Sequence, residues 1–193
     1  YTRTTMEGDA LYRNAGGIAG ISEGLISRCE NDGKISTTVV IAQNHVGGIV
    51  GLVSGANAEV TTCINHANIQ GYYCVGGITG AVKAGAEVHL SANYGDVKGN
   101  GIIGGVAGRV STTGMYSNGS AKECAVYDVY NLGQVSGYGT TAGSEMGGIV
   151  GEAGYENWKQ EALPPMPVIE RAYSVPISSG VNRNGGIIGY LLS

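Results

Sequence analysis

Short apolar stretches recur along the chain, and turn-forming glycine, asparagine and serine residues separate them. One pentapeptide marks the recurrence: it reads GGIAG at its first occurrence and returns as GGIVG, GGITG, GGVAG, GGIVG and GGIIG. Its copies begin at Gly16, Gly47, Gly76, Gly104, Gly147 and Gly185. The copies lie about 30 to 40 residues apart, which is the period of solenoids built from stacked repeat units.

A second motif lies between successive pentapeptides and holds an asparagine at a fixed distance from an apolar residue. In the first unit it reads C-x-N-x-G-x-I from Cys29 to Ile35, and the apolar Ile26 precedes it by three residues. A degenerate fifth copy carries Tyr173 where the asparagine is expected. The asparagines of the first four copies are Asn31, Asn65, Asn93 and Asn131.

Each unit thus offers three short apolar stretches, around the pentapeptide, around Ile26 and around Ile35 in the first unit. Such short strands cannot bury a face alone, but stacked units join them into three continuous parallel sheets. The pattern predicts an all-β chain, a parallel β-helix (β-solenoid) of about five coils, as a single domain over residues 1–193. One buried stripe is expected to contain Ile18, Ile49, Ile78, Val106, Ile149 and Ile187. A second is expected to contain Ile26, Val60, Val88 and Val126.

The spacing of apolar residues also predicts corners in the chain. The step from Val46 to Ile49 is three residues, whereas a flat strand returns to the same face after two. Both side chains point inward only if the chain bends between them. We expect the Gly47-Gly48 pair to supply this bend, because glycine tolerates positive φ.

The V-G-G-I-V-G core and the C-x-N-x-G-x-[IV] strand together resemble the GLUG repeat of bacterial surface proteins, which also occurs in non-catalytic regions of IgA-specific metallopeptidases. The resemblance extends from about Gly16 to Gly189. It implies a right-handed β-helix and a cell-surface or secreted location, but no single activity, because the repeat is a building unit. The chain departs from the pattern at Ala67, at Tyr173 and in two long units.

Composition and charge narrow the possible partners. The net charge is −4 and only 13% of the residues are charged, so the basic stripe that nucleic-acid binding needs is missing. No apolar run reaches the ~18 residues that would span a membrane. The chain begins at Tyr1 without a methionine, and we therefore expect it to be a piece of a larger protein.

In a stack of units, equivalent residues of successive units line up in columns along the stack. Two of these columns contain polar or reactive side chains. We expect the four asparagines to form a ladder of amide hydrogen bonds along the stack, rather than a binding strip. Cys29 and Cys63 fall in one column of adjacent units, where a disulfide and a pair of buried free thiols are both compatible with the spacing. Cys74 and Cys124 fall in other columns and have no evident partner.

Motifs for catalysis or metal binding are missing from the sequence. His45, His66 and His89 are the only histidines, and they fall in different columns, which does not suit a zinc site. The H-E-x-x-H, nucleophile-elbow and phosphate-loop motifs do not occur. Outward strand positions are expected to carry Thr, Ser, Ala and Lys, with no stacked carboxylate pair. We therefore expect no enzyme activity, no cofactor and no metal.

Two neighbouring units are longer than the others by about ten residues, inserted at the same place in each. The first insert lies near residues 112–123 and the second near residues 155–167. Insertions in repeat proteins map to loops on one face, often the binding face. They are either tolerated surface loops or a shared aromatic platform for a ligand. The platform residues would be Met115, Tyr116, Tyr155 and Trp158.

These features predict a non-catalytic repeat module of a bacterial cell-surface or secreted protein. It would act as a structural stalk, as an adhesive surface for a host glycan or protein, or as both. The alternative is an accessory region of a peptidase or a carbohydrate-active β-helix enzyme. Neither a nucleic-acid partner nor membrane insertion is expected, and unpaired strand edges predict end-to-end self-association.

Overall fold

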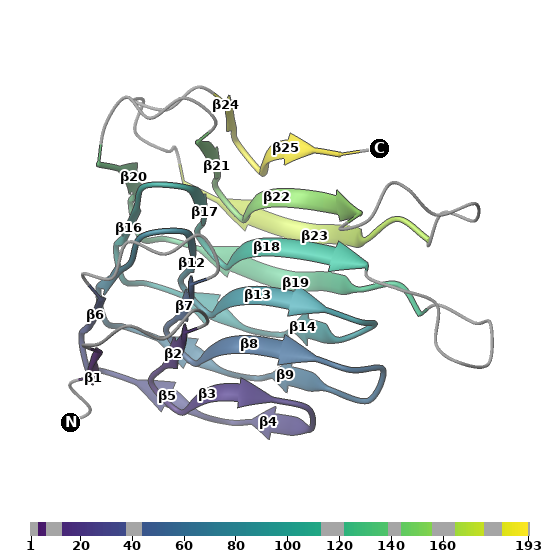
Figure 1. Cartoon of the computed structure of the whole chain (residues 1–193), viewed down its shortest axis with the longest axis horizontal. Coiled ribbons are helices and arrows are strands. Elements are labelled where there is room, and N and C mark those ends of the chain that lie inside the picture. The colour runs from purple at the N-terminus through teal and green to yellow at the C-terminus, as the bar shows by residue number, and fades with distance from the viewer. Residues whose placement is uncertain are drawn as a thin grey trace.

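The chain folds into parallel β-sheets (Figure 1). The computed structural model describes residues 4–6, 13–37, 44–112, 122–138, 144–155, 165–175 and 183–192. Within these ranges the secondary structure is strand without helix, and each strand pairs in parallel with the equivalent strand of a neighbouring unit. This arrangement is compatible with a β-solenoid.

The strands of the described residues form four sheets. Sheet A contains β1 (Thr4–Met6), β6 (Ile35–Thr37), β11 (Ile69–Gln70), β16 (Val97–Gly99) and β20 (Val135–Gly137). Sheet B contains β2 (Arg13–Gly16), β7 (Asn44–Gly47), β12 (Cys74–Gly76), β17 (Ile102–Gly104), β21 (Glu145–Gly147) and β24 (Arg183–Gly185). Sheet C contains β3 (Ala19–Ser22), β8 (Val50–Ser54), β13 (Thr79–Lys83), β18 (Ala107–Thr112), β22 (Val150–Tyr155) and β25 (Ile188–Leu191).

Sheet D receives two successive strands from each unit, and these strands form two rows. Its first row contains β4 (Leu25–Ser27), β9 (Glu59–Thr61) and β14 (Glu87–His89), and its second row contains β5 (Glu30–Asn31), β10 (Ile64–Asn65) and β15 (Ala92–Asn93). Both rows join on β19 (Ala125–Asn131), which pairs in turn with β23 (Val168–Ser174).

The expectation of three sheets was wrong, because the stretch around the pentapeptide makes two strands. In the second unit β7 ends at the first glycine, Gly47, and β8 begins at Val50. The strands before the break belong to sheet B and those after it to sheet C. A single apolar stretch in the sequence therefore contributes to two different sheets.

The four sheets form two pairs, and each pair encloses its own apolar core. Sheets A and B lie on the left of Figure 1, and sheets C and D lie on the right. Sheets A and B enclose the smaller core, where Ile69 and Val97 face Val75 and Ile103. Sheets C and D enclose the larger core. Its members include Ile49, Ile78, Val106, Ile149, Val53, Val82, Val60, Val88 and Val126.

Both predicted stripes lie in the larger core, with exceptions at the two ends. Ile49, Ile78, Val106 and Ile149 are fully buried, as are Val60, Val88 and Val126, and Ile26 is 8% exposed. Ile18 and Ile187, however, are 47% and 37% exposed. These two belong to the first and last copies of the pentapeptide, where a neighbouring unit covers the side chain from one direction only.

The two cores meet at a narrow waist made by asparagine and glycine. The asparagines lie where sheet D passes into sheet A, and the pentapeptide glycines lie opposite, between sheets B and C. A Cβ atom on Gly77 would lie 2.2 Å from Cγ of Asn93, and one on Gly48 would lie 2.4 Å from Cγ of Asn65. Only glycine permits this approach, so the repeated glycines are required by packing.

The chain bends at the Gly47-Gly48 pair, as expected, because β7 ends at Gly47 and β8 begins at Val50 in another sheet, but the pair does not use positive φ. Among the described glycines, positive φ occurs at Gly55, Gly85 and Gly154, which lie outside the glycine pair of the pentapeptide. The regular left-handed position is instead the corner between the two rows of sheet D. The residues at this corner are not glycines, and their φ angles lie between 46° and 55°. They are Arg28, Thr62, Leu90, Asp128 and Arg171.

The degenerate unit is shifted by one residue from the predicted alignment. Asn131 pairs with Ser174, and Tyr130 pairs with Tyr173, so serine rather than tyrosine takes the place of the asparagine. In this unit Ile169 accordingly pairs with Val126.

The strands that flank the two inserts are in register. At their start Thr112 of β18 pairs with Tyr155 of β22, and at their end Ala125 of β19 pairs with Val168 of β23. Both inserted segments therefore leave sheet C and enter sheet D at adjacent positions of neighbouring units.

Candidate functional site

The outer face of sheet D carries two columns of polar side chains on either side of the buried valines. Glu59 and Glu87 are paired in register on adjacent strands, and Thr61 and His89 are paired in the same way. The expectation that no carboxylates stack was therefore wrong. The signal was present in the sequence, because each glutamate directly precedes a valine of the buried stripe and must point to the opposite face.

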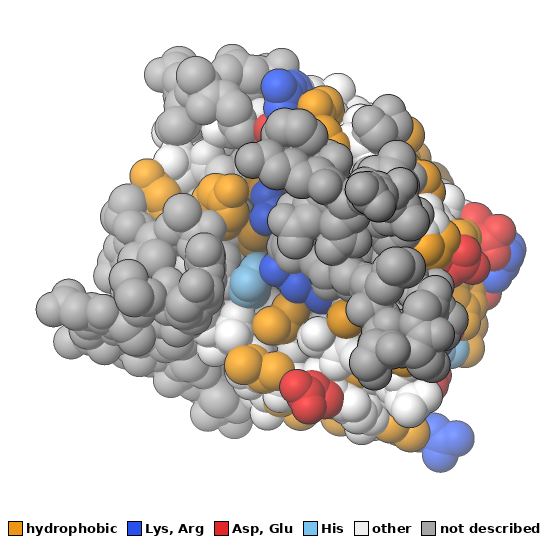
Figure 2. All heavy atoms as spheres, turned by 45° about the vertical axis from the view of Figure 1, so that its right-hand side comes forward, with side chains coloured by type: hydrophobic (Ala, Val, Ile, Leu, Met, Phe, Trp, Pro, Cys, Tyr) orange, Lys and Arg blue, Asp and Glu red, His pale blue; other side chains and the backbone are white. Residues whose placement is uncertain are grey.

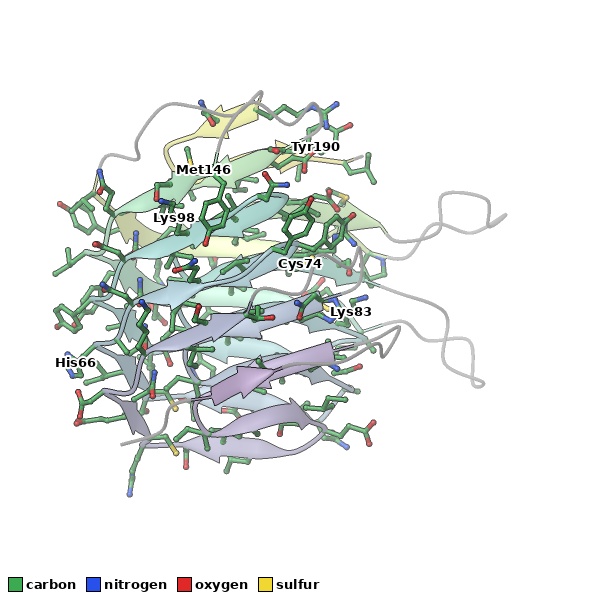
Figure 3. All side chains as sticks on the ribbon, turned by 60° about the vertical axis from the view of Figure 1, so that its left-hand side comes forward. His66, Cys74, Lys83, Lys98, Met146 and Tyr190 are labelled. Atoms are coloured by element: carbon green, nitrogen blue, oxygen red, sulfur yellow. The ribbon has the colours of Figure 1, made fainter. Side chains whose placement is uncertain are left out.

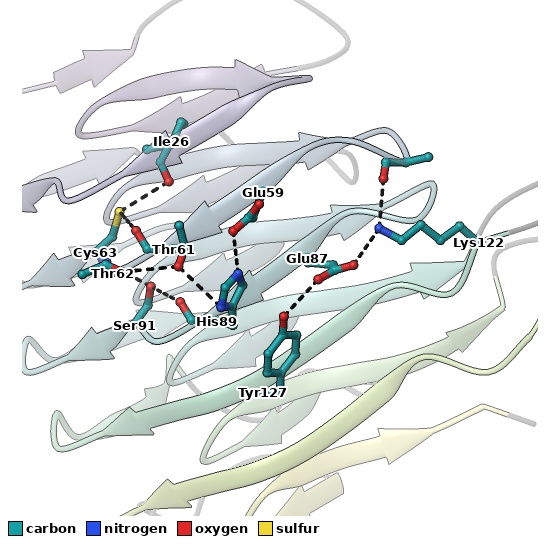
Figure 4. A network of polar contacts seen from close by, with 11 residues as sticks. Ile26, Glu59, Thr61, Thr62, Cys63, Glu87, His89, Ser91, Lys122 and Tyr127 are labelled. Atoms are coloured by element: carbon teal, nitrogen blue, oxygen red, sulfur yellow. Dashed lines mark hydrogen bonds and ion pairs between the residues drawn. The ribbon is translucent and has the colours of Figure 1, made fainter.

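His89 lies at the centre of a polar network on this face (Figure 4). Its Nε2 atom lies 2.6 Å from Oε1 of Glu59, and its Nδ1 atom lies 3.4 Å from the hydroxyl of Thr61. The imidazole also stacks on the ring of Tyr127, with 4.7 Å between ring centroids and an interplanar angle of 8°. These contacts fix the ring both in its plane and perpendicular to it.

Tyr127 connects this histidine to a second ion pair. Its hydroxyl donates to Oε2 of Glu87 at 3.1 Å, and Oε1 of Glu87 lies 2.6 Å from Nζ of Lys122. Lys122 also donates to the carbonyl oxygen of Ala56. The hydrogen bond from Lys122 lowers the pKa of Glu87, and that from Tyr127 adds to the effect. Glu87 is therefore a carboxylate at neutral pH.

Arg171 closes the network on the side of the last described strand of sheet D. Its guanidinium lies 5.4 Å from the centroid of the Tyr127 ring and donates to both carboxylate oxygens of Asp128, at 2.6 and 3.0 Å. It also pairs with Glu170. The hydrogen bonds from Arg171 lower the pKa of Asp128. Tyr127 is thereby held between His89 on one side and a cation on the other.

A cavity of about 460 Å³ lies beside this network, at the point where the inserts enter sheet D. The residues that line it are Glu87, Lys122, Glu123, Ala125, Tyr127, Val168 and Glu170. Aromatic, carboxylate and ammonium groups therefore reach one hollow. This combination suits a polar ligand that offers several hydroxyl or amide groups.

The ionisation of Glu87 and Asp128 differs from that of a general acid. A general acid at neutral pH needs a carboxyl group whose pKa is raised. The pKa of Glu87 is lowered instead, and Asp128 is tied to Arg171. The described residues contain no group of three or more His, Cys, Asp or Glu side chains placed to hold a metal ion.

Three of the four predicted platform residues, Met115, Tyr116 and Trp158, lie outside the described residues. Of the fourth, Tyr155, the structure describes the backbone at the end of β22. The described part of the inserts is the segment next to sheet D, and this segment borders the cavity. Lys122 and Glu123 are the residues of the first insert that reach it.

The asparagine column forms a continuous chain of hydrogen bonds through the waist. Nδ2 of Asn31, Asn65 and Asn93 each donates to Oδ1 of the next asparagine, at 2.8, 2.7 and 2.7 Å, and Asn131 donates to the hydroxyl of Ser174. Each amide also donates to the carbonyl oxygen two residues later. The four amides are buried, so this column contributes to folding and offers no free surface.

The cysteines are reduced. Cys29, Cys63, Cys74 and Cys124 are all free thiols. Cys29 and Cys63 do lie in one column, because Glu30 pairs with Ile64 on adjacent strands. Burial raises the pKa of the Cys63 thiol, which makes it an unreactive, largely apolar group.

A second polar cluster lies on the faces of sheets B and C that are turned away from the two cores. Figure 2 shows a histidine beside basic side chains near the centre of the view. His45 is 7% exposed, and its Nδ1 atom lies 2.7 Å from Oδ1 of Asn14. Arg109 pairs with Glu152 at 2.8 Å, and Arg183 pairs with Glu145 at 2.7 Å. Each ion pair links neighbouring strands of one sheet, with Arg109 and Glu152 in sheet C and Arg183 and Glu145 in sheet B.

Burial and charge decide the ionisation of this second cluster. Burial, together with the positive charges of Lys83 and Arg109, lowers the pKa of His45 to about 3. The imidazole is therefore neutral. Burial raises the pKa of Glu145, and the neighbouring Glu152 adds to this effect.

Comparisons with family models, with curated proteins and with solved structures find no match for this chain. The described residues also contain no helix that could cross a membrane.

Proposed function

We propose that the chain is a right-handed β-helix of about five coils with two inserted loops, and that it is a non-catalytic module of a secreted or surface-exposed bacterial protein. It extends its parent protein and presents a binding surface for a host glycan or protein. The observation that carries the proposal is the cavity beside Tyr127, bordered by the points where both inserts enter sheet D.

Three features support binding at this place. The inserts are the main departure from the repeat, and their flanking strands are adjacent. Tyr127 offers an aromatic ring held between His89 and Arg171. Glu87 and Lys122 offer hydrogen-bonding groups whose positions are fixed before a ligand arrives, which reduces the entropy lost on binding.

The test is a glycan array and a panel of host surface proteins, probed with the whole chain and with Tyr127→Ala. Removal of the ring should weaken binding of any captured ligand by at least roughly tenfold, as for an aromatic anchor in a pocket. Tyr138→Ala is the matched control, because Tyr138 is exposed and follows β20 of sheet A, away from sheet D. Equal binding by both variants would place the ligand elsewhere, and an empty array and panel would leave only the stalk role.

The alternative is a carbohydrate-active enzyme, and one observation favours it. Glu59, Glu87, His89 and Tyr127 bring two carboxylates, an imidazole and a phenol together on one sheet. If these groups cleave a polysaccharide, acidic and neutral polysaccharides incubated with the chain will gain new chain ends, and Glu87→Gln will abolish the gain. The proposal of a non-catalytic module predicts no new ends with either protein.

We also propose end-to-end self-association through the outermost units. At one end Ile18 is 47% exposed, and at the other Ile187 and Leu191 are 37% and 54% exposed, although the equivalents of Ile18 and Ile187 in the inner units are fully buried. Strands β3 and β25 are the outer strands of sheet C in the described residues. Sedimentation velocity should show a mass that rises with concentration, and Ile18→Lys should suppress the rise. A mass that does not change with concentration would contradict the proposal.

A further inference from the structure

A row of exposed aromatic and apolar side chains runs along the second half of sheet D, apart from the polar network. We call it the aromatic strip and define it as His66, Tyr94, Tyr130, Leu132 and Tyr173. Tyr94, Tyr130, Leu132 and Tyr173 are 41%, 36%, 43% and 61% exposed. Figure 3 shows His66 at the edge of the molecule, pointing away from the sheets.

The asparagine ladder explains why these side chains are all on the surface. Successive residues of a strand point to opposite faces, and the asparagines point inward to the waist. Residues directly before and after each asparagine must therefore point outward. Tyr130 and Tyr173 precede the ladder positions, and His66, Tyr94 and Leu132 follow them.

The rings form a row with one ring in each unit, and the row crosses from the column after the asparagines to the column before them between Tyr94 and Tyr130. His66 and Tyr94 stack with 5.2 Å between centroids and an interplanar angle of 13°. Tyr94 and Tyr130 meet edge to face with centroids 5.7 Å apart, and their hydroxyl oxygens lie 2.6 Å apart. Tyr173 continues the row, since it pairs in register with Tyr130. The period of the row is thus close to the distance between neighbouring strands.

The strip contains no carboxylate, ammonium or guanidinium group. Its two columns begin with Glu30 and Asp32 in the first unit, and from His66 onward the described members are neutral or weakly basic. A surface of this kind does not select a strongly charged partner. Contiguous exposed apolar area that the fold does not need marks a site of interaction.

We propose that the aromatic strip binds a neutral, extended polysaccharide chain that lies along the stack of units. The apolar faces of sugar rings pack on aromatic side chains, and phenol hydroxyls donate to and accept from sugar hydroxyls. The strip repeats at one interval, and a chain of identical sugar rings also repeats, with a length per ring similar to the spacing of the row. A chain of identical sugar rings can repeat one contact at each step of the row, and so the regularity of the strip favours the polysaccharide.

The experiment measures binding of neutral hexasaccharides (chitohexaose, cellohexaose and mannohexaose) to the whole chain by isothermal titration calorimetry. An acidic hexamer of galacturonate serves as the charged comparison. At least one neutral hexamer should bind, and more tightly than its trimer, because a longer chain covers more of the row. Tyr173→Ala and Tyr130→Ala should each weaken binding roughly 3- to 10-fold, as for the loss of one aromatic contact.

Two control variants make the result specific. Tyr138→Ala removes an exposed tyrosine that follows β20 of sheet A and should leave the affinity unchanged. Tyr130→Phe keeps the ring and removes the hydroxyl pair with Tyr94, so it separates ring packing from hydrogen bonding. Circular dichroism checks that each variant is folded, and Tyr173, as the most exposed tyrosine of the strip, is the substitution that the fold tolerates best.

The strip and the cavity make different predictions, so either can fail alone. Binding that is lost in Tyr127→Ala but unchanged in both strip alanine variants overturns the strip and supports the cavity. Hexasaccharides that bind no more tightly than trimers, or that do not bind at all, also overturn the strip. A protein partner that depends on Tyr173 while every neutral hexamer fails would overturn the polysaccharide assignment.

Discussion

Acidification should destabilise this chain through a single buried histidine. His45 is neutral in the folded protein, because burial and the nearby charges of Lys83 and Arg109 lower its pKa to about 3. In the unfolded chain the imidazole has an ordinary pKa of about 6.5. As the pH falls below 6.5 the unfolded chain takes up a proton that the folded chain refuses, so the folded state loses stability.

The size of the effect follows from the two pKa values. Each pH unit in the window between them is worth about 1.4 kcal/mol. Lowering the pH from 7 to 5 crosses about 1.5 units of this window, so the free energy of unfolding should fall by about 2 kcal/mol through His45 alone. The pKa values of Glu87 and Asp128 are lowered, and their contributions disappear only in more acidic solution.

The assay is urea unfolding followed by circular dichroism at pH 7, 6 and 5, with wild type beside His45→Gln. Glutamine can still donate an N–H to Asn14 but cannot take up a proton, so the wild type should lose about 2 kcal/mol more than the variant over this range. The pKa of Glu145 is raised, so that carboxyl acts in the opposite direction, but it acts in both proteins. Equal losses in the two proteins would refute the reasoning.

Three further outcomes can be measured by similar means. Asn93→Ala should lower the free energy of unfolding by roughly 3 to 5 kcal/mol, because it removes the bonds with Asn65 and Asn131 and leaves buried amide groups incomplete; a loss below 1 kcal/mol in urea would contradict the ladder. Ile78→Ala should cost about 2 to 5 kcal/mol in the same assay, and a near-neutral result would mean that the side chain is not buried. The Cys63 thiol should react with iodoacetamide far more slowly in the native chain than in urea, as mass spectrometry of the labelled peptide can show.

The sequence was most informative about the features that every unit repeats. Parallel strands, the inward valines and the asparagine column all follow from a period of about 30 residues and from alternation within strands. Each of these features depends on contacts between equivalent residues of neighbouring units. A repeat in the sequence predicts such contacts directly, because the same residue type faces itself along the stack.

The features that the sequence did not predict depend on contacts across the stack. The close approach of Gly77 to Asn93 joins two motifs within a cross-section, and no periodicity indicates which motif lies opposite which. The split of the pentapeptide between two sheets has the same origin. The stacked Glu59 and Glu87 were within reach of the sequence, but they are visible only after the units are aligned on the buried valine rather than on the pentapeptide.

Packing restricts the inward side chains much more than the outward ones, and this difference indicates which positions are free to serve a function. Inward positions are fixed by the two cores and by the waist, where a changed side chain would meet its copies above and below. Outward positions on sheet A also vary, since Ser36, Gln70 and Lys98 occupy one column. Sheet D differs, because its outward side chains contact one another in two clusters, the polar network around Tyr127 and the aromatic strip. A solenoid that only extended its parent protein would have no need for these two clusters, and so they favour sheet D as the surface that meets a ligand.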